Sequence, residues 1–502
     1  MKEVITVEIG QGGIQLGNVV WEQYCAEYGI DKTGKLDSKN AEHSFNTFFV
    51  EANNGQFVPR MIAVDLEPDV IDEIKTGSFG AIFHPAYLIS GNENASNYAR
   101  GYHTLGKQIF DRVNDRFHKV MDDCDNILGF VIFHSVGGGT GSGLGSLILE
   151  RLSVNYRKKS VIGFEIYPSS QLSTCVIEPY NALLATHWII DHTNVSVVLD
   201  NQAIYNICQS KLHIPKPDVS HLNYLIAKVI SAMTWPIRFD REIYTDISEY
   251  EKYLAPFPRL HFMTTGMSPI VSKTDKATTL SDSEKIVAES FKPANWLVEY
   301  TKFNPEEDKY MAASLSFRGD FRMGEVNAIT NWIKWNRKMC LVEWCPTGLR
   351  IGTIRIPAAI LEHDDISAFT KNAIMIGNNT GISRMFAKRI VQKFDIMFSQ
   401  QAFLHWYFNE EMEIGEFMEA REDLAFLEKD YMDVLSEQPS DEGPSHGESD
   451  VDGDISEFFK LISNVYFSWR KSILFIMVPL NYVSFYRNWQ KKQVYFPHDQ
   501  IM

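Results

Sequence analysis

The chain has 502 residues, of which 45% are hydrophobic and 13% aromatic, and this length exceeds what a single hydrophobic core supports. Its formal net charge of −16 argues against nucleic acid as a partner and suits partners with basic surfaces. The six cysteines include no C-x-x-C pair, so neither a zinc site nor a disulfide framework is expected. Because the first residues enter a strand pattern directly, we expect no signal peptide and a reducing, cytoplasmic location.

The first 200 residues alternate between strand and helix patterns. Apolar runs predict strands at residues 4–9, 61–65, 127–133, 161–166 and 195–199. Helices are predicted at residues 10–28 and 98–124. Repeated strand–helix–strand units indicate the α/β class, with a parallel sheet covered by helices on both faces. Ligands bind such sheets at the carboxyl ends of the strands.

The glycine-rich run at residues 137–143, GGGTGSG, lies between a predicted strand and a predicted helix at 144–152. Its five glycines let the backbone approach an anion, and the following helix N-terminus presents unpaired N–H groups. No lysine follows the last glycine, so the run is not a Walker loop, and it also differs from the dinucleotide fingerprint. A plain linker is the alternative, but its position between strand and helix favours a phosphate-binding loop.

Two further loops fall at the ends of predicted strands. Gly10 and Gln11 follow the first strand, and Asp65, Leu66 and Glu67 end the second one. Because the carboxyl ends of parallel strands meet at one edge, we expect three loops to converge on one crevice. The alternative for the two acids is that they merely precede a helix N-terminus.

The remainder of the chain predicts two further folded parts. Residues 201–378 mix helix and strand patterns and predict an α+β intermediate domain that follows the α/β part at 1–200. Residues 379–435 predict a helical C-terminal domain. Within it, residues 409–431 carry nine acids, with an apolar stripe at Phe417, Leu424 and Leu427. This pattern indicates a helix packed on a core, whose acidic outer face is either solvated or a docking surface for basic partners.

The end of the chain departs from globular composition. Residues 436–457 hold eight acids and no lysine or arginine, which predicts an acidic disordered segment. Residues 458–502 form an aromatic, apolar extension of unknown role, and its longest uncharged stretch is too short for a standard membrane span. A membrane-surface segment, a partner-binding segment and a divergent extension all remain open for it.

The motifs of residues 1–435 together resemble tubulin. They are GQGGIQLGN at 10–18, the glycine-rich run, VIEPYN at 176–181, PFPRLHF at 256–262 and WCPTG at 344–348. The resemblance implies a tubulin-type GTPase domain with a parallel sheet, an intermediate α+β domain and a helical C-terminal domain.

Among tubulins, the chain resembles the α type. Residues 405–407 and 416–424 are similar to the α-type C-terminal helices, and residues 358–367 keep the length of the α-type insertion. Residues 246–249 resemble the α-type loop that carries an acid where β-tubulin has a lysine.

The resemblance implies binding of GTP with Mg²⁺. By position, it assigns phosphate contacts to the glycine-rich run and Gln11, ribose contacts to two residues, guanine contacts to two asparagines, and the Mg²⁺ side to Asp65 and Glu67, with Glu67 as the metal residue. The implied GTP-binding residues are Gln11, Glu67, Ser135, Gly138, Gly139, Thr140, Gly141, Thr174, Glu178, Asn201 and Asn223. In this set Thr174 and Glu178 stand on the ribose side, and Asn201 and Asn223 are the guanine readers, since an amide both donates and accepts.

The resemblance also implies a GTPase that builds microtubules in the cytoplasmic cytoskeleton. The chain would be an α-type subunit that pairs with β-tubulin, and Glu249 would promote hydrolysis of GTP on a neighbouring β-subunit. Motors and microtubule-associated proteins would bind the acidic C-terminal helix. For Glu249 alone, the alternative is an exposed acid paired with Lys252 on one helix face. For the whole chain, the alternative is a specialised or non-polymerising tubulin-like GTP-binding protein.

Several positions depart from the family pattern. Val219 stands where tubulins usually stack an aromatic ring on guanine, and Asn94 stands where an acid is usual, in a loop one residue short. Thr278 replaces the usual histidine of the lateral loop. Residues 34–43 are shorter than in typical α-tubulins, with Lys39 near the position of the acetylated luminal lysine. These changes favour a divergent α-like isotype.

Overall fold

A computed structural model describes residues 2–36, 45–169, 175–239, 247–278, 282–300, 308–336 and 338–436, of which 276–278 and 436 by backbone alone. Residues 1–439 form one compact unit, and the account below is confined to its described part. Predictions for Lys39, Thr174, Asp246, the side chain of Thr278 and residues 437–502 lie outside the described residues.

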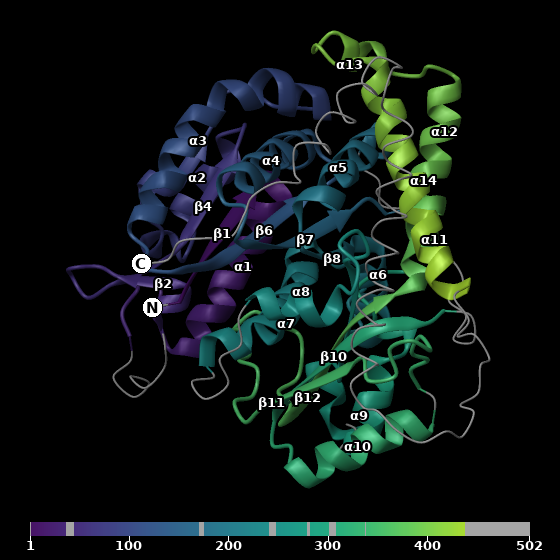
Figure 1. Cartoon of the computed structure of the whole chain (residues 1–502). Coiled ribbons are helices and arrows are strands. Elements are labelled where there is room, and N and C mark those ends of the chain that lie inside the picture. The colour runs from purple at the N-terminus through teal and green to yellow at the C-terminus, as the bar shows by residue number, and fades with distance from the viewer. Residues whose placement is uncertain are drawn as a thin grey trace, which may run out of the picture. The chain divides into compact units, whose positions relative to one another are not determined.

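A ten-stranded sheet runs through this unit (Figure 1). Its strands, in spatial order, are β11 (Leu349–Ile354), β10 (Tyr310–Gly319), β12 (Lys371–Asn379), β9 (Phe262–Ser268), β8 (Val195–Asp200), β7 (Ser160–Tyr167), β6 (Ile127–Ser135), β1 (Glu3–Ile9), β4 (Met61–Asp65) and β5 (Leu88–Ser90). All neighbours pair in parallel except β12, which is antiparallel to both β9 and β10. The predicted α/β class with a parallel sheet is confirmed.

The register brings the carboxyl ends of the central strands to one edge. Ile9 pairs with both Val64 and His134, Ser135 pairs with Ile166, and Tyr167 with Asp200. The apolar runs that predicted these strands are buried on both faces, as expected for a parallel sheet.

Helices cover both faces of the parallel part. One face packs against α3 (Leu105–Asp122), α4 (Gly145–Asn155) and α5 (Glu178–His192), and the other against α1 (Gly10–Tyr28), α2 (Asp69–Thr76) and α7 (Val219–Phe239). Between β8 and α7 lies α6 (Asn201–Lys211), and α8 (Ile247–Leu254) follows α7. The helix predicted at 98–124 begins at residue 98, contains a π-helical turn, η5 (Arg100–Thr104), and continues as α3. Short elements fill the first part: β2 (Phe49–Glu51), β3 (Phe57–Pro59), η2 (Phe45–Thr47), η3 (Gly80–Ile82) and η4 (Pro85–Tyr87).

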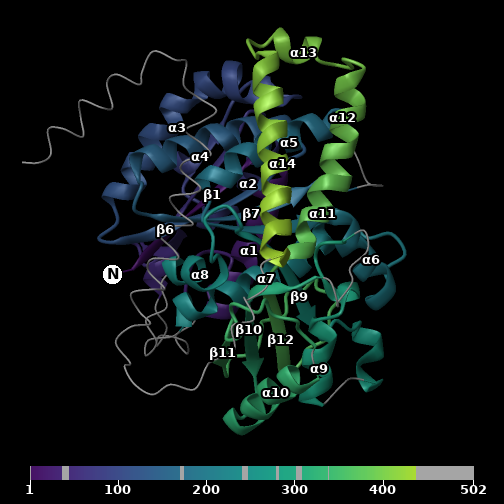
Figure 2. The same cartoon turned by 45° about the vertical axis from the view of Figure 1, so that its right-hand side comes forward.

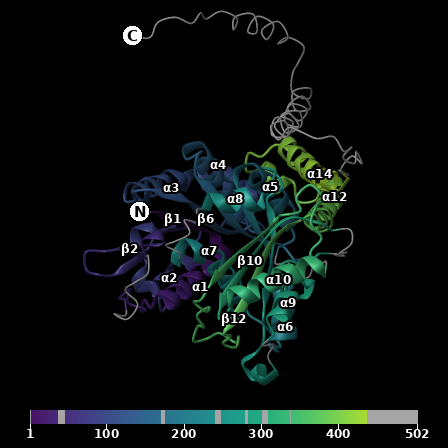
Figure 3. The ribbon, with the colours of Figure 1, turned by 60° about the horizontal axis from the view of Figure 1, so that its bottom comes forward.

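The second part of the chain extends the same sheet. Ser196 and Val197 of β8 pair in parallel with Phe262 and Met263 of β9, so the strands after residue 260 belong to the same sheet. Figure 3 shows α9 (Ser283–Ser290) and α10 (Met323–Trp335) beside β10 and β12. Two short turns, η7 (Lys273–Thr278) and η8 (Pro293–Asn295), complete this region.

The described part of the chain ends in helices that pack on the helical layer formed by α3, α4 and α5. α12 (Gln392–Ser399) and α14 (Ile414–Ser436) run side by side, joined by α13 (His405–Phe408) (Figure 2). Before them come η9 (Thr380–Ile382), α11 (Ser383–Met385) and the π-helical η10 (Phe386–Val391). The predicted stripe of Phe417, Leu424 and Leu427 is buried, and it joins the core cluster of α3, α4 and α5. The outer face of α14 also exposes Met418 and Met432, so it is less uniformly acidic than predicted.

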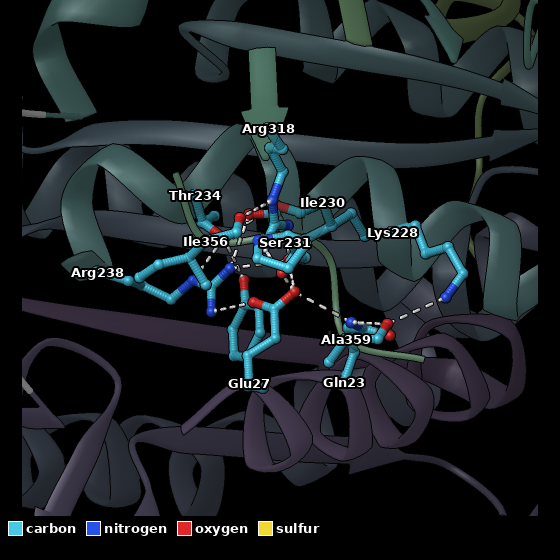
Figure 4. Close-up of polar contacts among 12 residues, drawn as sticks. Gln23, Glu27, Lys228, Ile230, Ser231, Thr234, Arg238, Arg318, Ile356 and Ala359 are labelled. Carbon is cyan, nitrogen blue, oxygen red and sulfur yellow. Dashed lines mark hydrogen bonds and ion pairs between the residues drawn. The ribbon is translucent and has the colours of Figure 1, made fainter. Parts of the chain in front are cut away.

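A buried ion-pair cluster lies near the C-terminal end of α1 (Figure 4). Glu27 pairs with Arg238 of α7 at 2.7 Å and with Arg318 of β10 at 3.1 Å, and these side chains are at most 1% exposed. Burial alone would raise the pKa of Glu27, but Arg238 and Arg318 lower it to about 2. The cluster therefore joins α1 to elements from both parts of the sheet.

Within the described ranges, no helix is both long enough and apolar enough to cross a membrane.

Candidate nucleotide site

The glycine-rich run follows β6 at the carboxyl edge of the sheet. Only residues 136–138 form a bend, because Gly139 already starts a helix that continues as the π-helical η6 (Thr140–Leu144) and α4. The predicted loop is thus corrected to a short bend plus the first turns of a helix. Gly138 is exposed, and an added Cβ there would meet no neighbouring atom. This geometry leaves the first N–H groups of the helix open to an anion.

The N-terminus of α1 abuts this turn. Gly10, with φ +69°, lies so close that an added Cβ would be 3.2 Å from the amide nitrogen of Gly141. Two residues further along α1, an added Cβ on Gly12 would be equally close, at 3.2 Å, to the side chain of Ser135. Gln11 between them is exposed at the start of the helix. Two helix N-termini therefore point at one place, and both favour negative charge there.

The acidic loop after β4 lies beside the same turn. Asp65 is 3% exposed, and its carboxylate bonds the side chain of Thr140 and accepts the backbone N–H of Glu67 at 3.3 Å. Burial raises the pKa of Asp65 to about 6, against these hydrogen bonds. Asp65 gives α2 no side-chain cap, so it does not act as the helix N-terminal acid of the alternative interpretation. Glu67 stays half-buried next to it.

The loop at residues 91–97 covers the turn from another side. An added Cβ on Gly139 would lie 2.1 Å from the carbonyl oxygen of Ala95 and 2.7 Å from the amide nitrogen of Asn97. Only glycine permits this approach of two backbones. Asn94 itself is exposed.

On the expected ribose side, Glu178 starts α5 next to the bend. A Cβ on Gly137 would lie 3.4 Å from Cγ of Glu178, and Glu178 Oε1 accepts the N–H of Cys175 at 3.2 Å. Thr174 lies outside the described residues.

The two predicted guanine readers lie on neighbouring helices. Asn201 begins α6 directly after β8, at the same strand edge as the glycine-rich run. Asn223 is buried in α7, one helical turn after Val219, which is exposed. We call residues 136–141 the phosphate turn. Among the described residues, neither asparagine side chain forms a hydrogen bond with this turn; what they share with it is the strand edge for Asn201 and the packing of α6 on α7 for Asn223.

Glu249 lies at the other edge of the sheet. It stands in the first turn of α8, whose Ile247 packs against Gly129 near the amino end of β6. Gly129 and Ser135 are separated by about 20 Å along the strand, at roughly 3.3 Å per residue. The alternative, in which Glu249 pairs with Lys252, is wrong: its carboxylate accepts from Arg350 of β11 at 2.9 Å. The guanidinium of Arg350 in turn lies 4.2 Å from the ring centre of Tyr253.

The structure adds two buried residues that hold the phosphate turn. His134 Nδ1 lies 2.9 Å from the carbonyl oxygen of Gly141, and burial lowers the pKa of His134 to about 4, so the neutral ring donates this bond. Asn181 of α5 donates from Nδ2 to the carbonyl oxygen of Gly137 at 2.9 Å. The sequence signal for His134 was a polar residue inside an apolar run, and Asn181 was part of the VIEPYN motif at 176–181, which gave it no role.

The geometry defines a phosphate-binding α/β protein with its site at the carboxyl edge of a parallel sheet, outside the Walker and dinucleotide classes. Family models identify that class: the GTPase domain of the Tubulin/FtsZ family matches residues 3–209, and the tubulin C-terminal domain matches residues 258–391. The chain belongs to the tubulin superfamily. It is a GTP-binding protein of the cytoskeletal kind, with the GTPase domain and the fold that the resemblance implied.

Proposed function

We propose that the chain is an α-type tubulin subunit that binds GTP with Mg²⁺ and pairs with β-tubulin in microtubules. The observation that carries this proposal is the separation of two groups along one sheet. The phosphate turn lies at the carboxyl ends of the strands, whereas Glu249 lies at their amino ends. At this distance from its own site, Glu249 acts instead on the nucleotide of the next subunit. This requires subunits that associate head to tail, through a heterologous interface.

Within the site, the predicted residues contact the phosphates, the ribose and the guanine of GTP. The amides of Gly138, Gly139 and Gly141 with the Thr140 hydroxyl hold phosphates, and Gln11 approaches them from α1. Ser135, Glu178 and Thr174 complete the phosphate and ribose side. Asn201 and Asn223 read guanine with amides that both donate and accept.

Glu67 is the proposed metal residue. The described part of the chain gathers no group of three acids, histidines or cysteines around a metal position. Mg²⁺ usually takes one or two carboxylates together with waters and substrate phosphates, so a half-buried Glu67 beside Asp65 fits it. The ion would neutralise charge on the phosphates when bound.

Glu249 is the proposed group that acts in trans. Arg350, held over Tyr253, fixes its carboxylate, and a fixed carboxylate is suited to orient an attacking water or accept its proton. The expected consequence is measured in microtubules assembled with β-tubulin. Glu249→Ala slows GTP hydrolysis by about 10²–10⁴-fold, typical of losing a general base, while the subunit keeps its own GTP.

Lys252→Ala is the matched control, because Lys252 is exposed on the same helix. It should leave hydrolysis unchanged. Normal hydrolysis by polymer that contains the Glu249 variant would overturn the role of Glu249. Failure of the wild-type chain to co-sediment with β-tubulin would overturn polymer function itself.

That second failure would favour the other candidate, a specialised or non-polymerising tubulin-like GTP-binding protein. Val219 supports this candidate, since it stands exposed where an aromatic ring would stack on guanine. Retention of GTP without co-sedimentation is its expected signature.

Partners and location follow from the same proposal. The subunit works in the cytoplasmic cytoskeleton, and motors and microtubule-associated proteins with basic surfaces bind the acids of α14.

A further inference from the structure

Asn181 joins three segments that are far apart in the sequence. Its Nδ2 donates to the carbonyl oxygen of Gly137 at 2.9 Å, in the bend of the glycine-rich run. Its Oδ1 accepts the backbone N–H of Tyr98 at 2.9 Å and the hydroxyl of Tyr407 at 2.7 Å. Asn181 has no exposed surface. One amide side chain therefore holds the phosphate turn, the end of the 91–97 loop and α13 together.

The chemistry of the partners fixes how this amide is oriented. A backbone N–H only donates and a backbone carbonyl only accepts, so Oδ1 must face Tyr98 and Nδ2 must face Gly137. No other residue type of this size offers a donor and a two-bond acceptor in that geometry.

Both loops that Asn181 holds are loops of the nucleotide site. Gly137 opens the bend, and Tyr98 follows the segment whose Ala95 and Asn97 backbone lies against Gly139. Fixing Gly137 and Tyr98 from one point therefore fixes the separation of two walls of the site.

The third contact reaches the C-terminal helices. Tyr407 is buried, while its neighbours Trp406 and Phe408 are exposed. The carbonyl oxygen of Trp406 also accepts from Asn97 Nδ2 at 3.2 Å. The short helix α13 is thus tied twice to the walls of the nucleotide site.

We propose that Asn181 is a positioning residue for the nucleotide: it sets the phosphate turn and the 91–97 loop at their binding separation and anchors both to α13. This inference rests on the proposed function, namely that GTP occupies the site. Because the phosphates contact the turn and not Asn181, its effect is on how long the nucleotide stays bound.

The test is GTP release from the purified full-length chain. Fluorescently labelled GTP is loaded, then chased with excess unlabelled GTP in the presence of EDTA, with thermal unfolding recorded in parallel. Asn181→Asp keeps size and both accepted bonds but turns an oxygen toward Gly137, so release should quicken by about tenfold or more. Tyr407→Phe removes only one of the two ties to α13, the bond to Asn181, and release should quicken by about threefold.

Thr186→Val is the matched structural control. Thr186 is a fully buried polar residue of the same helix, and its hydroxyl bonds the carbonyl oxygen of Ala182 and the hydroxyl of Tyr167. Its loss should lower the unfolding temperature and leave GTP release unchanged.

The outcomes separate the two proposals. A wild-type chain that retains no GTP overturns the proposed function. A wild-type chain that retains GTP, with release from Asn181→Asp as slow as from Thr186→Val, overturns only the positioning role, whatever the change in unfolding temperature.

Discussion

The two ends of α1 use polar residues in opposite ways. At its N-terminus, Gln11 is exposed beside the phosphate turn. At its C-terminal end, Glu27 is buried and paired with two arginines, and it also accepts from Ser231 at 2.6 Å and Gln23 at 3.0 Å. Sixteen residues of one helix, about 24 Å, separate these environments.

This difference between the two ends of α1 distinguishes a ligand site from a structural polar cluster. In the cluster, the charges of Glu27, Arg238 and Arg318 pair with one another within the protein. At the site, helix N-termini converge and their N–H groups face an open bend. Burial and charge alone would have marked Glu27, not Gln11, as the functional residue.

The largest effect is expected for Glu27→Ala, at the buried end of α1. It leaves Arg238 and Arg318 buried without their common carboxylate, and the free energy of unfolding should fall by about 3–5 kcal/mol. Urea unfolding followed by circular dichroism measures this change. Lys32→Ala is the control, because Lys32 and Glu362 form an exposed pair at 3.9 Å, whose loss should cost within about 0.5 kcal/mol. Equal costs for both variants would contradict a structural role for the Glu27 cluster.

A second prediction concerns the middle of α1. Glu8 of β1 is buried beneath it and accepts from Trp21 Nε1 at 2.7 Å, and burial raises the pKa of Glu8 to about 8. The folded state thus holds a proton that the unfolded state releases above about pH 4.5, so stability declines as pH rises from about 4.5 to 8.

The measurement is the free energy of unfolding at pH 6 and pH 8. For this group alone the loss between the two is about 2 kcal/mol. Glu8→Gln, which stays neutral, should remove that part of the decline. A variant with the same slope as the wild type would show that Glu8 is not the group that titrates.

The smallest expected effect is at the open end. Gln11→Ala should weaken GTP binding by about tenfold, as one hydrogen bond is lost, and change the free energy of unfolding by less than about 0.5 kcal/mol. Fluorescent GTP titration and urea unfolding measure the two quantities. Loss of stability without loss of affinity would mean that Gln11, like Glu27, has a structural role and does not bind GTP.

Much of the fold could be predicted because parallel strands are buried on both faces. Their apolar runs placed β1, β4, β6, β7 and β8 to within two residues. The pairing of β8 with β9 could not be predicted, because it depends on residues more than sixty positions apart. Local periodicity says nothing about which strand ends lie side by side.

In the candidate site, too, local sequence patterns predicted some features, and contacts between distant residues could not be predicted. Glycines and acids at strand ends are local signals, and Gly10, Asp65 and the glycine-rich run do meet. For Glu249, the local alternative was a pair with Lys252, three residues away, yet Glu249 pairs with Arg350. Asn181 gave no local signal of its contacts with Gly137 and Tyr407. Contacts between distant segments, rather than residue types, decide these roles.

The pinned end of α1 has a mechanical consequence. A helix of 19 residues is stiff, and this one is clamped at its far end to α7 and β10 through Glu27. It therefore keeps its position in the domain, and its N-terminal residue Gly10 stays at a fixed place beside the phosphates. The bend at 136–138 and the loop at 91–97 are held instead by the hydrogen bonds of Asn181, which are weaker than buried ion pairs, so these walls yield more readily as nucleotide enters or leaves.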